Sequence, residues 1–400
     1  MRSLTLGLLA GSLFLSGCDL VPGPPVTVPD FPSKTLPVPA PPPPAPRPPS
    51  PAPPSASLTG LGNPFADVYP ASFVNSKGRI EDLAVVDGRI YLGHGSTASH
   101  TPVRPIYYDV AAGRWGSDDA RIAQEATLGL QVGPSGRLYA TSDDAQGRNA
   151  VLMIRRERDG SWTQRAVDDR ENHSRDTYEW VDPQTGETLV FVQNAAPHFP
   201  DVSVSYDGGE SFVRYGYERA PGNVRSLDWY KFFEFKGDLY AASLPTLHIP
   251  GRPAPDPKPY LVRYTRDREH PFEVVTYSRG DVFPGDGTEI KATMEINGRI
   301  VMASSEFYAG DALDRDRIMQ LDVPDRAMDI IRVGGEVYLL SLDRRTGTSA
   351  LYSTRDGRTV TEFASFDRPF VAVEHTGGAF YLAESGGSVE NSLWRYVPGE

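Results

Sequence analysis

The pentapeptide Gly88-Arg89-Ile90-Tyr91-Leu92 places a turn glycine and a polar residue ahead of alternating apolar and aromatic side chains. Such alternation is typical of a half-buried β-strand that follows a tight turn. The pattern recurs along the chain at intervals of 37 to 61 residues, which gives seven copies. The other six copies begin at Gly136, Gly186, Gly237, Gly298, Gly335 and Gly378.

A second apolar pattern follows every copy of the first after 15 to 24 residues. Two interlocking patterns at one period of 40 to 50 residues indicate β-propeller blades of four short strands. A lone four-stranded sheet leaves its faces uncovered, whereas a closed ring buries each face on a neighbour. We therefore predict an all-β, seven-bladed β-propeller over residues 57–400, with six or eight blades as alternatives. The second pattern occupies residues 106–109, 152–155, 202–205, 261–264, 318–321, 351–354 and 393–396.

The seventh unit is one strand short, because the chain ends soon after its third strand. We predict that residues around Pro64 to Val74 supply the missing outer strand and close the ring by joining the two ends of the chain. This prediction explains why the domain begins well before Gly88.

Composition excludes several classes of protein. The chain contains 19 Tyr, 17 Phe and 5 Trp, too many aromatic residues for a fully disordered protein. A single Cys excludes a disulfide framework and a cysteine-based metal cluster. A net charge of −12 opposes electrostatic binding to nucleic acid. We expect no cofactor and no bound metal.

The first residues form an apolar segment that ends at Leu15-Ser16-Gly17-Cys18. Residues 4–15 are too few to span a hydrocarbon core of about 30 Å, but they have the length of a signal-peptide core. The ending resembles the lipobox of bacterial lipoproteins. The resemblance implies that residues 1–17 are removed and that lipid on Cys18 anchors the protein to a membrane of the bacterial envelope, outside the cytoplasm. The alternative is an ordinary secretory signal with an incidental cysteine.

A proline-rich segment follows Cys18. Residues 22–54 hold 17 of the 37 prolines, and proline can neither donate a backbone hydrogen bond nor continue a helix. We expect residues 18–56 to form a disordered, extended linker that spaces the propeller from the membrane. The alternative is a ligand for a proline-binding partner.

The third unit contains Ser205-Tyr206-Asp207-Gly208-Gly209-Glu210-Ser211-Phe212. This segment resembles the Asp-box of sialidase-like propellers, in which Ser and Asp bond the turn backbone and the aromatic residue packs between strands. Ser205, Asp207, Gly209 and Phe212 are the matching positions, and the resemblance implies a structural role away from the active site. Shorter versions occur at residues 353–360 and 159–162.

The resemblance to sialidases also implies an enzyme with three arginines on the substrate carboxylate, a Tyr–Glu nucleophile pair and an Asp acid/base. Arg79, Arg225 and Arg326 lie near predicted strand starts, and Glu306 lies close to Tyr308. The characteristic first-arginine motif is absent, since the nearest string, at residues 101–106, has the wrong order and position.

Two long segments, residues 245–258 and 303–316, are expected as loops between the second and third strands of their units, so that both rim one face. Residues 225–231 combine polar and aromatic side chains that suit sugar binding or packing between blades. Asp311, Asp314 and Asp316 suggest a calcium loop or a solvated acidic loop. The candidate binding residues are Arg225, Asp228, Trp229, His248, Arg252, Glu306 and Tyr308.

The sequence thus predicts a lipid-anchored, extracytoplasmic propeller that binds a glycan or an envelope protein at its loop-bearing face. The first alternative is a sialidase-like glycoside hydrolase, and catalysis is the less favoured reading. The second alternative is an assembly scaffold of the cell envelope. No catalytic residue is assigned.

Overall fold

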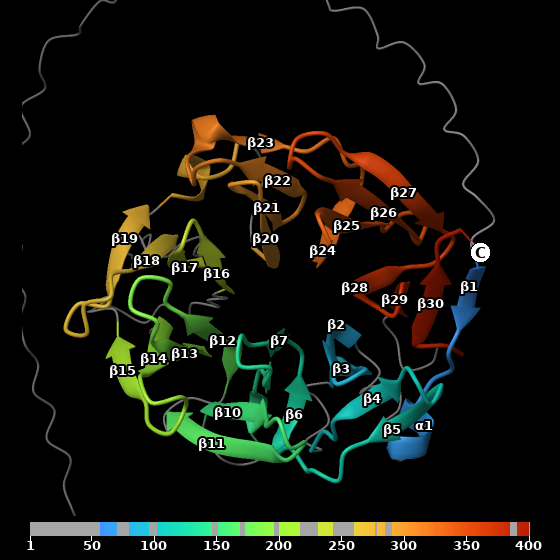
Figure 1. Cartoon of the computed structure of the whole chain (residues 1–400), viewed down its shortest axis with the longest axis horizontal. Helices are drawn as coiled ribbons and strands as arrows, with labels where there is room; N and C mark the ends of the chain where they lie inside the picture. Colours follow the sequence, from blue (N-terminus) through green and yellow to red (C-terminus); the bar gives the residue numbers. More distant parts are fainter. Residues whose placement is uncertain are drawn as a thin grey trace, which may run out of the picture. The chain divides into compact units, whose positions relative to one another are not determined.

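The computed structural model describes residues 57–69, 80–95, 102–145, 151–168, 173–195, 200–216, 231–242, 260–276, 278–284, 290–384 and 390–399. All of these residues belong to one compact unit, Ala52–Glu400. Seven antiparallel sheets surround a central channel, which confirms the all-β propeller of seven blades (Figure 1). Six of these sheets have four strands, and the sheet of blade 1 has six. No helix in this part of the chain has the length and apolar character needed to cross a bilayer.

The innermost strands of the blades line the channel, and the second strands pair with them. The innermost strands of blades 1 to 7 are β2 (Ile80–Val86), β7 (Leu130–Val132), β12 (Ser174–Val181), β16 (Lys231–Phe235), β20 (Ala292–Ile296), β24 (Arg326–Val333) and β28 (Phe370–Thr376). The second strands are β3 (Arg89–Gly95), β8 (Leu138–Ala140), β13 (Thr188–Ala195), β17 (Asp238–Ala242), β21 (Arg299–Ala303), β25 (Glu336–Asp343) and β29 (Ala379–Glu384).

The third and outer strands complete each blade toward the rim. The third strands are β4 (Ile106–Asp109), β10 (Val151–Arg156), β14 (Pro200–Ser205), β18 (Leu261–Tyr264), β22 (Phe307–Gly310), β26 (Thr348–Thr354) and β30 (Leu393–Val397). The outer strands are β5 (Arg114–Ser117), β11 (Trp162–Asp168), β15 (Val213–Gly216), β19 (Phe272–Thr276), β23 (Ile318–Gln320), β27 (Thr361–Phe366) and β1 (Ser57–Gly60).

A few elements lie outside this scheme. Strands β6 (Gln124–Thr127) and β9 (Asp143–Ala145) form a ribbon that pairs with the end of β3. The short helix α1 (Phe65–Val68) follows β1, and two 3₁₀ turns cover Arg279–Asp281 and Arg315–Arg317.

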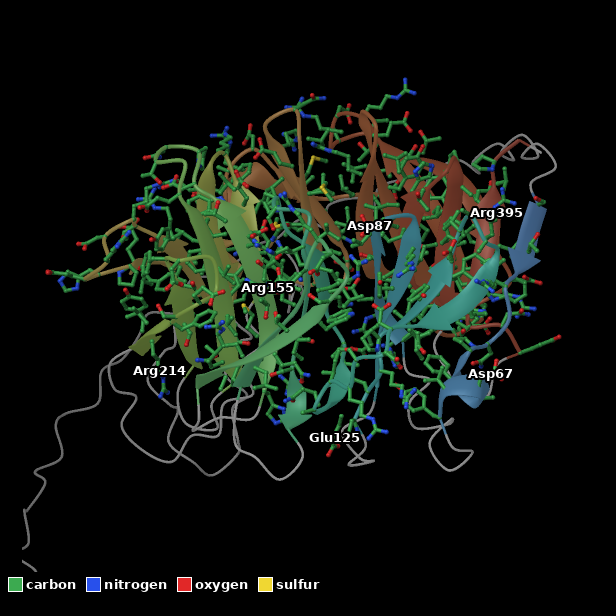
Figure 2. All side chains as sticks on the ribbon, turned by 60° about the horizontal axis from the view of Figure 1, so that its bottom comes forward. Asp67, Asp87, Glu125, Arg155, Arg214 and Arg395 are labelled. Atoms are coloured by element: carbon green, nitrogen blue, oxygen red, sulfur yellow. The ribbon has the colours of Figure 1, made fainter. Side chains whose placement is uncertain are left out.

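The repeated glycines stand where the sequence pattern placed them, one or two residues before the second strands. In blade 1 the turn residues Asp87 and Gly88 have φ values of 52° and 73°, and in blade 5 Asn297 and Gly298 have 51° and 72°. Two consecutive positive φ values define the turn whose twist matches an antiparallel hairpin, and glycine adopts the second at no steric cost. These turns define the turn face of the propeller, and the innermost strands begin at the opposite end, the loop face. Asp87 and Glu125 mark the two ends in Figure 2.

Hydrophobic side chains fill the spaces between neighbouring blades. Ile80 and Ile90 of blade 1 pack in one cluster with Ala372 and Tyr381 of blade 7. Comparable clusters join blades 3 and 4, 4 and 5, 5 and 6, and 6 and 7. The core is therefore distributed around the ring, and each blade depends on its two neighbours for burial.

The ring closes through the ends of the chain, as predicted, but the predicted segment was wrong. Strand β1 pairs antiparallel with β30, with Ser57 opposite Val397 and Gly60 opposite Trp394. Residues 64–69 do not supply the strand, because the backbone of Pro64 is helical and starts α1, and residues 70–74 lie outside the described residues. Leu58 packs against the cluster between blades 6 and 7, which gives β1 the apolar contact that fixes its position.

The segment 303–316 was also predicted wrongly. It contains the third strand β22, and residues 318–320 of the second apolar pattern form the outer strand β23. All four residues of β22 are buried. A short strand buried on both faces lacks the alternation that marks a strand in sequence, and it was therefore taken for a loop.

We predict that β1 is essential for a closed, monomeric ring. A chain that starts at Ser57 keeps β1, whereas a chain that starts at Gly62 exposes the edge of β30 and removes the burial of Leu58. The shorter chain should lose on the order of 3 kcal/mol of unfolding free energy and should self-associate. Thermal unfolding and size-exclusion chromatography with light scattering check this; equal stability of two monomeric chains would show that β1 does not close the ring.

Candidate functional site

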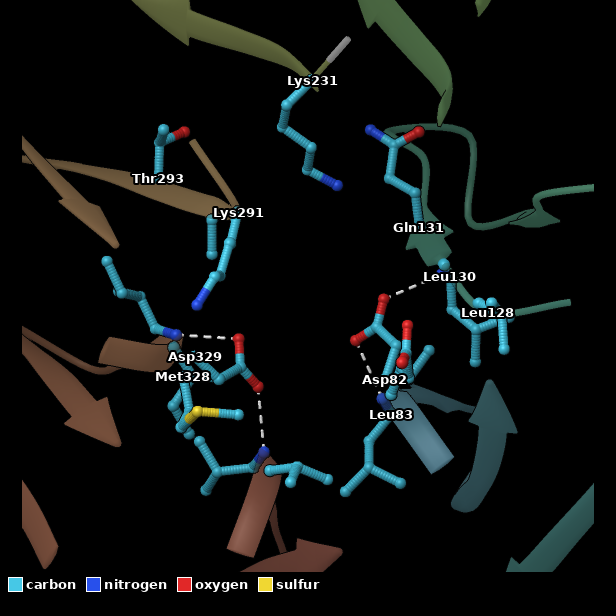
Figure 3. Close-up of a pocket in the computed structure, with 18 of the residues that line it drawn as sticks. Asp82, Leu83, Leu128, Leu130, Gln131, Lys231, Lys291, Thr293, Met328 and Asp329 are labelled. Atoms are coloured by element: carbon cyan, nitrogen blue, oxygen red, sulfur yellow. Dashed lines mark hydrogen bonds between the residues drawn. The ribbon is translucent and has the colours of Figure 1, made fainter. Parts of the chain in front are cut away.

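The central channel contains a cavity of about 770 Å³. Its walls come from the innermost strands of all seven blades and from residues just before them, and Figure 3 shows part of this lining. Charged side chains from six blades line the cavity, namely Glu81, Asp82, Arg175, Lys231, Lys291, Arg326, Asp329, Arg344 and Glu374. Most of them stand near the starts of the innermost strands, which places the charge toward the loop face.

Three aspartates occupy equivalent places in blades 1, 3 and 6. In β2, β12 and β24 the pairing register shifts by one residue just before Asp82, Asp176 and Asp329, as in a β-bulge. A bulge bends the strand and redirects the next side chain. Each carboxylate then accepts a backbone N–H from the innermost strand of the following blade. The donors are Leu130 at 2.8 Å, Phe232 at 2.8 Å and Val373 at 2.9 Å.

Asp82 and Asp329 face each other across the channel (Figure 3). Each uses its second oxygen to accept the N–H of the next residue, Leu83 or Ile330, at 2.8 Å. Burial and the nearby charge of Asp329 raise the pKa of Asp82 to about 7. Burial raises the pKa of Asp329 to about 6, although its backbone hydrogen bonds and Lys231 oppose the rise. Both carboxyl groups therefore titrate near neutral pH.

Glu374 of β28 adds a third carboxyl group to this side of the channel. Its Oε2 atom accepts the backbone N–H of His375 at 3.2 Å. Burial, followed by repulsion from Asp329, raises the pKa of Glu374 to about 8. At neutral pH this side chain is mostly a neutral acid, which can donate a hydrogen bond.

Basic side chains occupy the other side of the channel. Lys231, the first residue of β16, donates to Asp176 at 3.3 Å. Burial by itself would lower the pKa of Lys231, but Asp176 and Asp82 raise it above its ordinary value. Lys291 donates to the carbonyl oxygen of Ala327 at 2.8 Å and so reaches from blade 5 to blade 6. Both amines are therefore held in place as cations.

The candidate site residues from the sequence analysis do not come together in one site among the described residues. Arg79, Arg225, Asp228, Trp229, His248 and Arg252 lie outside the described residues, as does Cys18. Arg326 lines the cavity. Tyr308 donates to Glu306 at 2.9 Å, but its ring is fully buried in the cluster between blades 4 and 5, and neither residue lines the cavity.

Sequence reasoning identified Arg326 but missed the other charged residues of the channel, although the repeat carries a signal for several of them. Asp82, Lys231 and Asp329 each stand six residues before the turn glycine of their blade. Glu374 stands four residues before Gly378. In an alternating strand, charged residues are normally assigned to the face in contact with solvent. Only their equal distance from the turn glycine indicates that Asp82, Lys231 and Asp329 lie at the same level of the channel.

The turn at Ser205–Phe212 lies on the turn face, between β14 and β15. Asp207 accepts the backbone N–H groups of Glu210 and Ser211 at 3.0 and 2.9 Å, and the Ser205 hydroxyl accepts that of Gly209 at 2.7 Å. Hydrogen bonds from Ser211 and Ser205 hold the pKa of Asp207 well below its usual range. Phe212 packs against a buried cluster. These bonds order the turn at the end of the blade away from the channel charges.

The described residues contain no group of three or more His, Asp or Glu side chains arranged to hold a metal ion. Asp311 pairs with Arg317 at 2.8 Å, and the Asp314 carboxylate accepts the N–H of Asp316 at 2.9 Å. Through these contacts, the acidic segment stabilises the 3₁₀ turn before β23.

Comparisons with known proteins establish the fold. No protein-family model and no curated protein sequence matches the chain. Virginiamycin B lyase from Staphylococcus aureus aligns at a TM-score of 0.53 and 9% identity, over 86% of this chain and 99% of that one. A chain of the mitotic checkpoint complex aligns at 0.51 and 7% identity, over 86% and 94%. The β-propeller domain of the Trilobed protease from Pyrococcus furiosus, whose topology is described as open velcro, aligns at 0.50 and 9% identity, over 80% and 95%.

We predict that the raised pKa of Glu374 makes the protein less stable as pH rises. The folded state holds the proton of Glu374 up to about pH 8, whereas the unfolded chain releases it near its ordinary value of 4.5. Stability is therefore lost between about pH 4.5 and 8. Glu374→Gln should match the wild type at pH 5 and exceed it at pH 9 by on the order of 2 kcal/mol.

Chemical denaturation at both pH values checks this difference. Glu362→Gln is the matched control, because Glu362 is exposed on β27. A Glu374→Gln variant with the same pH profile as the wild type would contradict the prediction.

Proposed function

We propose that this protein is a lipid-anchored, extracytoplasmic binding module whose ligand enters the central channel from the loop face. The observation that carries the proposal is the channel itself, in which two carboxyl groups and two amines converge on a cavity of about 770 Å³. Pockets for small ligands usually enclose about 300–1,000 Å³ and combine apolar walls with a few fixed polar groups.

The apolar part of the wall supports the same proposal. Leu128, Ile290, Met294, Met328 and Ile331 line the cavity beside the charged groups. The backbone hydrogen bonds of Asp82 and Asp329 hold their carboxylates before a ligand arrives, so that little side-chain entropy is lost on binding.

Glycoside hydrolysis is the second candidate, since Asp82 and Asp329 form a facing carboxyl pair with pKa values of about 7 and about 6. One protonated and one ionised carboxyl group is the arrangement that glycosidases use. The Tyr308–Glu306 pair does not favour a sialidase-type site, because it is buried between blades and does not line the cavity.

A scaffold would be favoured by a broad apolar face. Among the described residues, the exposed large apolar side chains are scattered over blades 2 to 5. They are Val132, Val181, Val213, Val274, Val275 and Met319. Because these side chains form no broad apolar face, they favour a ligand-binding module over an assembly scaffold.

Lipid anchoring rests on the sequence alone, on Cys18 after the apolar segment 4–15. We predict that Cys18→Ala abolishes incorporation of labelled fatty acid and moves the protein out of the membrane fraction of bacterial cells. Ser16→Thr, which keeps the cysteine, serves as the control. Unchanged membrane association of Cys18→Ala would overturn the lipid anchor, because the protein would then be held at the membrane without it.

We predict that ligands bind in the channel and that Arg326 contributes to their affinity. A panel of glycans, peptides and small metabolites is screened with the purified full chain by thermal shift, and sugars are also assayed for hydrolysis. Arg326→Gln should weaken any anionic ligand at least tenfold, because it removes a cation from the cavity wall. Arg358→Gln, an exposed change at the turn face of the same blade, should have no effect. Equal losses of affinity in both variants would show that the ligand binds outside the channel. Turnover of a glycan would instead support the glycoside hydrolase.

A further inference from the structure

Basic and acidic side chains are interleaved around the channel. Arg326 and Arg344 lie on the same blade as Asp329, and the amine of Lys291 reaches from blade 5 to the carbonyl oxygen of Ala327 in that blade. Figure 3 shows basic and acidic side chains around one cavity. The ligand preference of the channel therefore follows from its total charge and not from oppositely charged walls.

The total charge depends on how many carboxyl groups hold a proton. Among the described residues, nine charged side chains line the cavity, and Asp176 pairs with Lys231 beside it, which makes five acidic and five basic groups. Their charges cancel when every group is ionised, and each proton on a carboxyl group then leaves one positive charge in excess. The acidic residues are Glu81, Asp82, Asp176, Asp329 and Glu374, and the basic residues are Arg175, Lys231, Lys291, Arg326 and Arg344.

Three of the five carboxyl groups gain protons near neutral pH. Burial is the largest cause, and it raises the pKa of Glu374 to about 8, that of Asp82 to about 7 and that of Asp329 to about 6. The excess of positive charge is therefore close to zero at pH 9 and about two at pH 6.5.

The remaining titratable groups beside these carboxyl groups do not change this balance. Tyr178 of β12 lines the cavity, and burial raises its pKa further above its ordinary value. His375 follows Glu374 on β28, and burial lowers its pKa. Both side chains are therefore mostly neutral from pH 6.5 to 9. Strand β7 contributes uncharged residues to the lining, namely Leu130, Gln131 and Val132.

Backbone hydrogen bonds keep the carboxyl groups at the cavity wall. Each oxygen of Asp82 and Asp329 accepts one backbone N–H, so neither side chain can rotate away without breaking two bonds. Glu374 accepts the backbone N–H of His375 on Oε2. A neutral carboxyl group carries its proton on a remaining lone pair and becomes a hydrogen-bond donor, which binds an anion strongly. Protonation therefore converts three fixed acceptors into three fixed donors.

We propose, on the basis of the channel site described above, that the ligand is a small organic dianion that binds together with protons taken up by the channel carboxyl groups. Two negative charges neutralise an excess of about two positive charges, whereas a cation would have to displace the protons. The apolar part of the wall, which includes Leu128, Met294 and Met328, favours an organic ligand over an inorganic ion.

Binding of a dianion is linked to pH with a definite sign. The negative charge of the ligand favours the protonated form of nearby carboxyl groups, so protons enter the site with the ligand. Affinity therefore rises as the pH falls from 9 to 6.5, the range in which Glu374 and Asp82 gain most of their protons.

The test is calorimetric titration of the purified full chain with 1,3-benzenedisulfonate and fumarate, which are dianions throughout this pH range. Their uncharged counterparts are benzene-1,3-disulfonamide and fumaramide. At pH 6.5 at least one dianion should bind, with an affinity about tenfold or more above that of its counterpart. Its affinity should be about a hundredfold lower at pH 9, or tenfold for each of the two charges lost. At pH 7.5 the heats in Tris and imidazole buffers should differ in the sense of proton uptake.

Three results would overturn the proposal. They are equal affinity of a dianion and its counterpart, an affinity that does not fall between pH 6.5 and 9, and no binding of either dianion.

A variant assigns the proton uptake to the channel. Glu374→Gln is neutral at every pH, so it should raise the affinity for the dianion about tenfold at pH 9 and leave it unchanged at pH 6.5, where Glu374 is already neutral. Glu362→Gln, on the exposed side of β27, is the matched control and should change neither value. An unchanged pH dependence in Glu374→Gln would contradict the proposal. If thermal unfolding shows that this variant has lost its fold, Asp82→Asn replaces it.

Failure of the dianion can be distinguished from failure of the channel site. If both dianions fail while another compound of the wider panel binds, Thr293→Trp locates that compound, because Thr293 lines the cavity and the larger side chain narrows it. Loss of binding in this variant would refute the dianion and leave the channel-binding function in place. Unchanged binding would overturn both.

Discussion

Burial between neighbouring blades is the constraint on which this structure depends. A four-stranded sheet has two faces, and the clusters that cover them combine residues from adjacent blades, such as Ile80 with Tyr381 and Phe233 with Ile300. A ring in which every blade needs two neighbours cannot tolerate an open end. The pairing of β1 with β30 is therefore part of the core and not an appendage, since it ties the last blade to the first segment of the propeller.

The same constraint creates the channel and its charges. Packing seven sheets around an axis leaves a cavity at the centre, and bulges in β2, β12 and β24 direct three aspartates so that each bonds the backbone of the following blade. Such bonds join adjacent blades near the axis. They also bring carboxyl groups close together in a partly dehydrated space, which raises the pKa values of Asp82 and Asp329. In the proposed channel site, the side chains that join the blades are the same ones that would contact a ligand.

The repeat in the sequence was sufficient to predict the fold but not the site. Turn glycines are readable because positive φ angles restrict the residue at six of the seven positions, all except Gly335, and all seven precede second strands. Strand β22 was missed because full burial removes alternation. The layer formed by Asp82, Lys231 and Asp329 was missed because these residues lie far apart in sequence, and only the closure of the ring brings them together. Glu306 and Tyr308 were correctly judged to be close, yet their bond lies between blades.

The position of β1 has a consequence for biosynthesis. Its partner, β30, lies far along the chain, so the first strand of the propeller must wait until all the other blades have been synthesised before it can pair. Contacts of such large sequence separation form slowly, and unpaired strand edges invite association in the meantime. Closure of the ring is therefore expected to be late and cooperative, and to occur only after β30 has been synthesised.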